Sequence, residues 1–143
     1  MRVSKVNINP NGNPLHLPLF ASRVRAGFPM TADDHIETTM DLNEQLIKHP
    51  NQTFFVRAEG NSMVNAGIQD GALLLVDCSL TPKHDDIVIA SIDGQMTCKF
   101  IDTKLHPLRS ANPHFEPIPI KEGNQVQVMG VVIYVINKLC NHL

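Results

Sequence analysis

The pattern of hydrophobic and polar positions changes near residue 50, where a helical period gives way to the alternation typical of β-strands. Segments rich in β-branched and apolar side chains follow, separated by turn residues such as glycine, aspartate and proline. They predict strands at Thr53–Ala58, Ala72–Asp77, Asp86–Asp93, Gln95–Ile101 and Val126–Ile136. We therefore expect a mainly β fold of twisted antiparallel sheets.

Two of these strands are predicted to form a hairpin around Asp93-Gly94. Aspartate and glycine tolerate the positive φ angles that a two-residue type I′ turn requires. The turn places Lys99 on the return strand, where side chains alternate between the two faces of the sheet. One face is expected to carry Met96, Cys98 and Phe100, and the other Thr97, Lys99 and Ile101.

Ahead of the strands the sequence predicts one short helix, from Asp41 to about Lys48. Asp41 is a good N-cap and Glu44 follows three residues later, as in a capping box. Pro50 stops the helix. Leu42, Leu46 and Ile47 would form its buried face.

The first residues read as an extended arm, because Pro10, Pro14 and Pro18 oppose helix formation. We expect residues 1–27 to be a flexible N-terminal arm and residues 28–143 to form one β-rich domain. A chain of 143 residues, 43% of them hydrophobic, is long enough for such a core.

Charge differs between these two parts. Residues 1–26 carry four basic and no acidic side chains, whereas the remaining 117 residues carry eight basic and fourteen acidic ones, a balance of −6. An acidic body argues against strong direct binding to DNA. No run of apolar residues is long enough to span a bilayer or to form a signal-peptide core, so we expect no membrane contact and a cytoplasmic protein.

Neither the cysteines nor the histidines predict a metal or a cofactor. Cys78, Cys98 and Cys140 lack the paired Cys-x-x-Cys spacing of zinc sites, and we expect all three to be packing residues. His84, Asp85 and Asp86 have no second ligand group at a suitable spacing, and a polar turn explains them better.

Ser62 and Lys99 are the residues that could carry chemistry. Ser62 lies in the turn Gly60-Asn61-Ser62-Met63, and Lys99 follows it by thirty-seven residues. A serine hydroxyl needs a base to become a nucleophile, and a lysine serves as that base when burial favours its neutral amine. From the residues alone, an ordinary turn and a surface lysine remain the alternative.

The order and spacing of many short motifs resemble the UmuD-type mutagenesis proteins, relatives of the LexA repressor whose C-terminal domain is a self-cleaving serine-lysine peptidase. The resemblance extends over most of the chain. Its motifs are Ala26-Gly27-Phe28-Pro29, Asp41-Leu42-Asn43, Leu46-Ile47, His49-Pro50, Gly60-Asn61-Ser62-Met63, Gly67-Ile68, Asp70-Gly71, Leu74-Leu75-Val76-Asp77, Asp86-Ile87-Val88-Ile89-Ala90, Asp93-Gly94, Thr97 with Lys99, Asn112-Pro113 and Gly130-Val131-Val132-Ile133.

This resemblance implies that Ser62 is the nucleophile, Lys99 the general base and Ala26-Gly27 the scissile bond. We expect the backbone N–H of Ser62 to serve as an oxyanion donor. The resemblance also implies that a RecA filament on single-stranded DNA stimulates the cut. The product, residues 27–143, would then join a UmuC-like DNA polymerase subunit as a homodimer in error-prone translesion synthesis.

Three residues depart from the family pattern: Asn61 replaces a frequent aspartate, Asp85 a glycine and Phe100 a basic residue. Asp85 fits a positive-φ turn better than most residues do. A β interaction module that has kept only the fold is therefore one alternative. A LexA-type repressor fragment is a second alternative, but a repressor would need a DNA-reading domain. A signal peptidase is a third, and it would need a membrane anchor. Trypsin-like cleavage after Arg25 is the alternative to cleavage at Ala26-Gly27.

Overall fold

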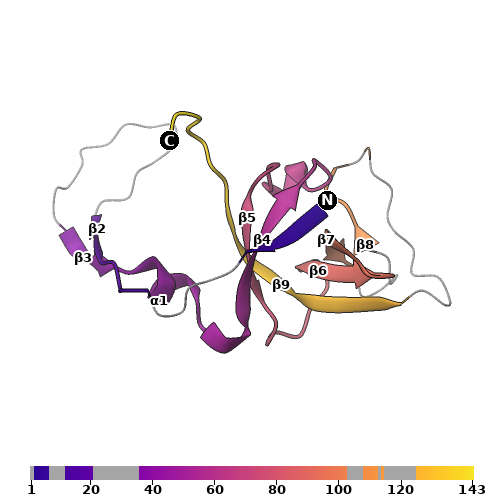
Figure 1. Ribbon diagram of the computed structural model, residues 1–143, viewed down its shortest axis with the longest axis horizontal. Helices are drawn as coiled ribbons and strands as arrows, with labels where there is room; N and C mark the ends of the chain where they lie inside the picture. Colours follow the sequence, from indigo (N-terminus) through magenta and orange to yellow (C-terminus); the bar gives the residue numbers. More distant parts are fainter. Residues whose placement is uncertain (1, 7–11, 21–35, 103–107, 113, 115–124) are drawn as a thin grey trace. The chain divides into compact units, whose positions relative to one another are not determined.

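The computed structural model describes residues 2–6, 12–20, 36–102, 108–112, 114 and 125–143 (Figure 1). It confirms a mainly β fold with antiparallel strands. The chain forms two compact units, which are described separately. The larger unit combines Met1–Ile8 with Asn51–Leu143, and the smaller unit is Asn9–Pro50.

The larger unit is built on a seven-stranded sheet with the order β1-β4-β5-β9-β6-β7-β8. An additional pairing of Arg2 with Thr97 joins β1 to β7, so that the first strand lies against two strands that are distant in the sheet order. The strands are β1 (Arg2–Val6), β4 (Thr53–Glu59), β5 (Leu73–Asp77), β6 (Ile87–Ile92), β7 (Gln95–Ile101), β8 (Leu108–Arg109) and β9 (Val126–Ile136). A 3-10 turn at Val64–Ala66 lies in this unit, and another, Pro50–Gln52, begins at the last residue of the smaller unit.

The strands predicted from alternation are confirmed in this unit. β7 and β9 have the expected bounds, β4 ends one residue later, and β5 begins one residue later. β6 begins one residue later and ends one residue earlier than predicted. The hairpin is also confirmed, because Ile92 pairs with Gln95 across a two-residue turn. Asp93 and Gly94 in that turn have φ angles of 50° and 84°, as a type I′ turn requires.

The core of the larger unit consists of two hydrophobic clusters. The major core contains Val56, Ala58, Met63, Ile68, Ala72, Leu74, Val76, Ile89 and Cys98, and the minor core contains Val88, Ala90, Leu108 and Val131. Met96 and Phe100 pack on the major core with Cys98, whereas Ile101 packs on the minor core. This division confirms the predicted alternation along β7.

In the smaller unit, β2 (Leu17–Phe20) pairs with β3 (Ile36–Met40), and α1 (Leu42–Leu46) follows. The N-cap is confirmed, because the Asp41 side chain accepts a hydrogen bond from the Asn43 N–H at 3.1 Å. The expectation of a buried helix face is wrong for Leu42, which is 55% exposed, while Leu46 and Ile47 are half-buried. A two-stranded ladder and one helical turn offer little apolar surface that could cover Leu42.

Part of the expected N-terminal arm lies in these ladders. β1 pairs with β4 along its length, from Arg2 opposite Glu59 to Val6 opposite Phe55, and β2 pairs with β3. Ala26 and Gly27 lie outside the described residues, and the division at residue 27 stays a prediction. In the part of the chain that the structure describes, no helix is both long and apolar enough to cross a bilayer.

Candidate active site

Ser62 lies in a tight turn directly after β4. Gly60, at φ 98°, lets the chain leave the strand, and its N–H donates to Asp70 Oδ1 at 2.9 Å. The Val64 N–H closes the turn on the Asn61 carbonyl at 3.2 Å. Met63 is fully buried in the major core and fixes the turn against the sheet. Ser62 itself is only 1% exposed.

Lys99 reaches Ser62 from β7. Its backbone pairs with Val88 of β6 in the middle of the hairpin, and the residue is 4% exposed. Lys99 Nζ lies 2.7 Å from Ser62 Oγ, within hydrogen-bond distance. The structure thus brings together two predicted site residues, which the sequence separates by thirty-seven positions.

Burial changes the proton affinity of both ionisable side chains at this point of β7. It lowers the pKa of the Lys99 amine, because a charged ammonium loses hydration in the interior. The same cause raises the pKa of the Cys98 thiol to about 12, so this thiol stays protonated. Lys99 is therefore suited to act as a base, whereas Cys98 is a packing residue, as predicted.

The packing role predicted for the other two cysteines needs correction. Cys78 is exposed just beyond the end of β5, and Cys140 is half-buried near the C-terminus. Both follow strands rather than occupying their inward positions, so strand alternation does not bury them.

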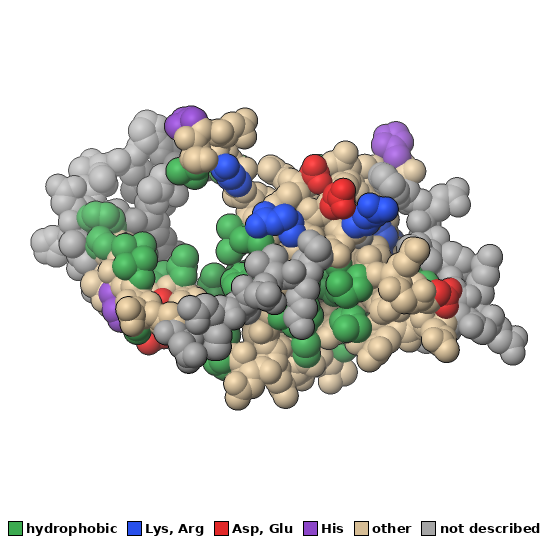
Figure 2. Space-filling model, viewed as in Figure 1, with side chains coloured by type: hydrophobic (Ala, Val, Ile, Leu, Met, Phe, Trp, Pro, Cys, Tyr) green, Lys and Arg blue, Asp and Glu red, His purple; other side chains and the backbone are tan. Residues whose placement is uncertain are grey.

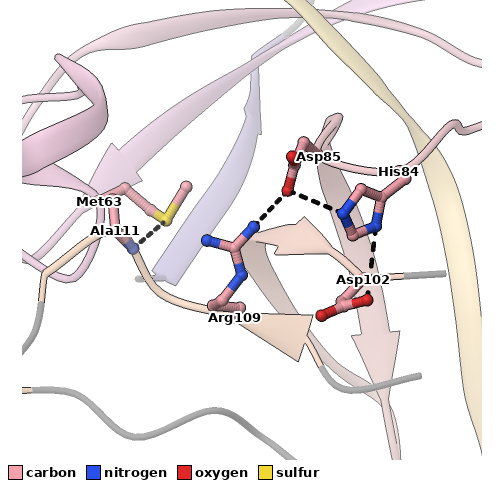
Figure 3. Close-up of polar contacts among 6 residues, drawn as sticks. All are labelled: Met63, His84, Asp85, Asp102, Arg109 and Ala111. Atoms are coloured by element: carbon pink, nitrogen blue, oxygen red, sulfur yellow. Dashed lines mark hydrogen bonds and ion pairs between the residues drawn. The ribbon is translucent and has the colours of Figure 1, made fainter. Parts of the chain in front are cut away.

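A short segment after β8 contacts the Ser62 turn, and sequence analysis did not identify this role. The Asn112 N–H donates to the Ser62 carbonyl at 2.9 Å, and Asn112 Nδ2 donates to the Asn61 carbonyl at 3.3 Å. The Ala111 N–H lies 3.4 Å from the Met63 sulfur (Figure 3). The resemblance had included Asn112-Pro113, which was the only sequence signal for this segment.

A second polar cluster lies on the same unit and contains His84, Asp85, Asp102 and Arg109 (Figure 3). Arg109 pairs with Asp85. His84 Nε2 lies 3.5 Å from Asp85 Oδ1, and His84 Nδ1 lies 3.4 Å from Asp102 Oδ1. Asp85 has a φ of 68°, so the aspartate occupies the positive-φ turn that its position required. Among the described residues, no group of three or more His, Cys, Asp or Glu side chains could hold a metal ion.

The charged surface of the larger unit is mixed in sign on the face shown in Figure 2, where acidic and basic side chains lie next to one another. A pocket beside β1 has the same character: Arg2, Arg57, Glu59 and Asp70 line it. Arg2 Nη1 lies 3.9 Å from Glu59 Oε2, and Arg57 Nη1 donates to the Gly71 carbonyl oxygen at 2.8 Å. Positive charge in this pocket is therefore offset by nearby carboxylates.

Comparison with known proteins gives a consistent result. The family described as Peptidase S24-like matches residues 18–133. Protein ImpA of Salmonella typhimurium is 42% identical over 134 residues, covering 91% of this chain and 90% of its own. Protein SamA of Salmonella typhimurium strain LT2 is 42% identical over 125 residues, covering 85% of each chain. Protein MucA of Escherichia coli is 36% identical over 120 residues, covering 82% of each chain.

Proposed function

This chain belongs to the Peptidase S24-like family and is a UmuD-type protein, and on that premise we propose that it cleaves its own Ala26-Gly27 bond. Ser62 is the nucleophile and Lys99 the general base. The observation that carries this proposal is the 2.7 Å distance between Lys99 Nζ and Ser62 Oγ in a buried environment. Buried lysine and serine side chains in contact are suited to nucleophilic catalysis.

In the proposed reaction, neutral Lys99 takes the hydroxyl proton as Ser62 Oγ attacks the carbonyl carbon of Ala26. The oxygen of the tetrahedral intermediate needs backbone donors, and the Ser62 N–H is our candidate. Lys99 then gives the proton to the Gly27 nitrogen as the peptide bond breaks, leaving Ala26 esterified to Ser62. Lys99 then takes a proton from water as the water oxygen attacks the ester carbon, and returns it to Ser62 Oγ as the ester bond breaks, which frees the Ala26 carboxyl group. The products are residues 1–26 and residues 27–143.

The biological setting of this cut is also part of the proposal. A RecA filament on single-stranded DNA stimulates cleavage, and the shortened chain acts as a homodimer with a UmuC-like DNA polymerase subunit in translesion synthesis. The relationship to UmuD-type SOS mutagenesis proteins supports this assignment. The cut removes four basic side chains from a chain whose net charge is −2, so it also makes the product markedly more acidic.

Self-cleavage of the purified full-length chain tests the proposal. Incubation between neutral and alkaline pH should shorten the chain from its N-terminus, with a rate that rises with pH because neutral Lys99 becomes more abundant. Mass spectrometry and N-terminal sequencing should identify Gly27 as the new first residue. Ser62→Ala and Lys99→Ala should each stop the reaction. A different new terminus, or shortening that continues in Ser62→Ala, would contradict the proposal.

A further inference from the structure

We propose that Arg109, held by Asp85 and Phe100, is a positioning residue for self-cleavage. It fixes β8, so that Ala111 and Asn112 hold the turn that carries Ser62. This inference rests on the proposed function and adds a residue outside the Ser62–Lys99 pair. Asp85 and Phe100 are two of the three positions at which this chain departs from the UmuD-type pattern. The structure places both of them against the same arginine.

Asp85 and Phe100 hold the Arg109 side chain, an arrangement called here the Arg109 clamp. Its guanidinium pairs with the Asp85 carboxylate (Figure 3). It also lies 4.9 Å from the centre of the Phe100 ring. Asp85 is itself anchored, because its N–H donates to the Ile101 carbonyl at 2.9 Å. A planar guanidinium between a carboxylate and an aromatic face has a restricted orientation.

The backbone of Arg109 needs such an anchor. β8 contains only Leu108 and Arg109, which pair with Ile101 and Phe100 at the end of the sheet order. A ladder of two residues provides few hydrogen bonds, and short edge segments are among the first to open in a folded protein. The Arg109 clamp adds a side-chain contact on the same strand pair, because Phe100 is also the backbone partner of Arg109.

The residues just after Arg109 connect the Arg109 clamp to the nucleophile. Two residues after Arg109 the Ala111 N–H contacts the Met63 sulfur, and the next residue, Asn112, donates from its backbone and side chain to the carbonyls of Ser62 and Asn61. The contacts therefore bracket Ser62 on both sides of its turn. A shift of β8 along β7 would withdraw these donors, and small displacements of a catalytic group cost large factors in rate.

The experiment compares self-cleavage of the wild-type full-length chain with that of five variants. They are Arg109→Gln, Arg109→Lys, Asp85→Asn, the double variant Asp85→Asn with Arg109→Gln and, as the matched control, Lys138→Gln. Asp85→Asn removes the charge and keeps a residue that tolerates positive φ. Lys138→Gln removes one exposed positive charge elsewhere. Each variant is followed by mass spectrometry across pH, by thermal unfolding, and by hydrogen exchange at the amides of Ala111 and Asn112.

Arg109→Gln should slow cleavage about three- to tenfold at every pH, with the pH midpoint unchanged, because Lys99 keeps its surroundings. Arg109→Lys should recover part of the cleavage rate. The rate of Asp85→Asn should lie between those of the wild type and Arg109→Gln, and Lys138→Gln should cleave at the wild-type rate. The double variant Asp85→Asn with Arg109→Gln should cleave as Arg109→Gln does, since both changes break one contact. The Ala111 and Asn112 amides should exchange faster in Arg109→Gln.

Several outcomes would overturn the inference. One is an Arg109→Gln variant that cleaves and exchanges at these amides as the wild type does. Another is a slower rate that follows a lowered unfolding temperature and recovers fully on cooling, because this would indicate a general loss of stability. A wild-type chain that does not shorten contradicts the proposed function instead, and the exchange of Ala111 and Asn112 then still decides whether the Arg109 clamp holds the Ser62 turn.

Discussion

Two contacts between a basic side chain and an oxygen, Lys99 with Ser62 and Arg109 with Asp85, differ in exposure. Lys99 and Ser62 are 4% and 1% exposed, whereas the Arg109 and Asp85 side chains are 39% and 59% exposed. Burial lowers the pKa of Lys99 and makes its proton transferable. The planar guanidinium of Arg109, by contrast, suits pairing with a carboxylate and stacking on an aromatic ring. The same kind of contact therefore suits chemistry in the interior and orientation at the surface.

The largest expected effect comes from replacing the buried lysine by an apolar side chain of similar length. Lys99→Met should lower the rate of self-cleavage at least about a thousandfold, because Ser62 loses its base while the fold keeps its packing. Intact mass measured over several days at alkaline pH gives the rate. Detectable cleavage in Lys99→Met, at a rate comparable to Arg109→Gln, would remove the distinction between the two contacts.

The next prediction concerns stability and pH, measured in a Ser62→Ala background that should not cleave. Folding lowers the pKa of Lys99 from 10.5, so the unfolded chain binds the proton more tightly than the folded chain. The free energy of unfolding should therefore rise with pH above the folded pKa and level off near 10.5. Adding Lys99→Met should remove this rise, as denaturant titrations at several pH values would show. Identical pH profiles with and without Lys99→Met would argue against a depressed pKa.

The exposed contact should have a smaller effect, which a double-mutant cycle isolates. Phe100→Leu removes the ring beneath the guanidinium, and Arg109→Gln removes the cation. Their coupling in the free energy of unfolding should be about 0.5–1 kcal/mol, the range of exposed cation–π contacts. Urea denaturation of the two single variants and the double variant measures it. Strict additivity would mean that the ring and the guanidinium do not stabilise one another.

The smallest expected effect lies in the segment that joins the two contacts. Ser110 Oγ is buried and, among the residues that the structure describes, has no hydrogen-bond partner. Ser110→Ala removes a polar atom that folding has taken out of water, so the protein should keep its stability or gain up to about 1 kcal/mol. Thermal unfolding tests this expectation. A loss of more than about 1 kcal/mol would instead indicate that the hydroxyl is satisfied in solution.

Local sequence signals predicted the elements that position Lys99. Alternation predicted β7 and its two faces, and Asp93-Gly94 predicted the hairpin turn, because both depend on residues close in sequence. The N-cap at Asp41 was predicted for the same reason. Ser62 and Lys99 were paired through family resemblance, and the structure places their side chains in contact.

The contacts that sequence analysis missed depend on pairing between distant segments. β8 has two residues, too few for alternation to be recognised, and nothing near Arg109 points to Asp85 or to the Ser62 turn. The pairing of β1 with β4 joins segments about fifty residues apart, and proline-rich sequence after β1 suggested only an extended arm. Leu42 was misjudged because periodicity identifies an apolar face without showing what covers it.

The position of β1 also bears on aggregation. β1 pairs with β4 along its whole length, and so covers a strand edge whose N–H and C=O groups would otherwise face solvent. Uncovered edges are templates for strands of other chains. β1 lies on the N-terminal side of Ala26, so the proposed cut severs its covalent link to the rest of the sheet. Once the fragment dissociates, β4 becomes an open edge, and the full-length chain is the form better protected against intermolecular strand pairing.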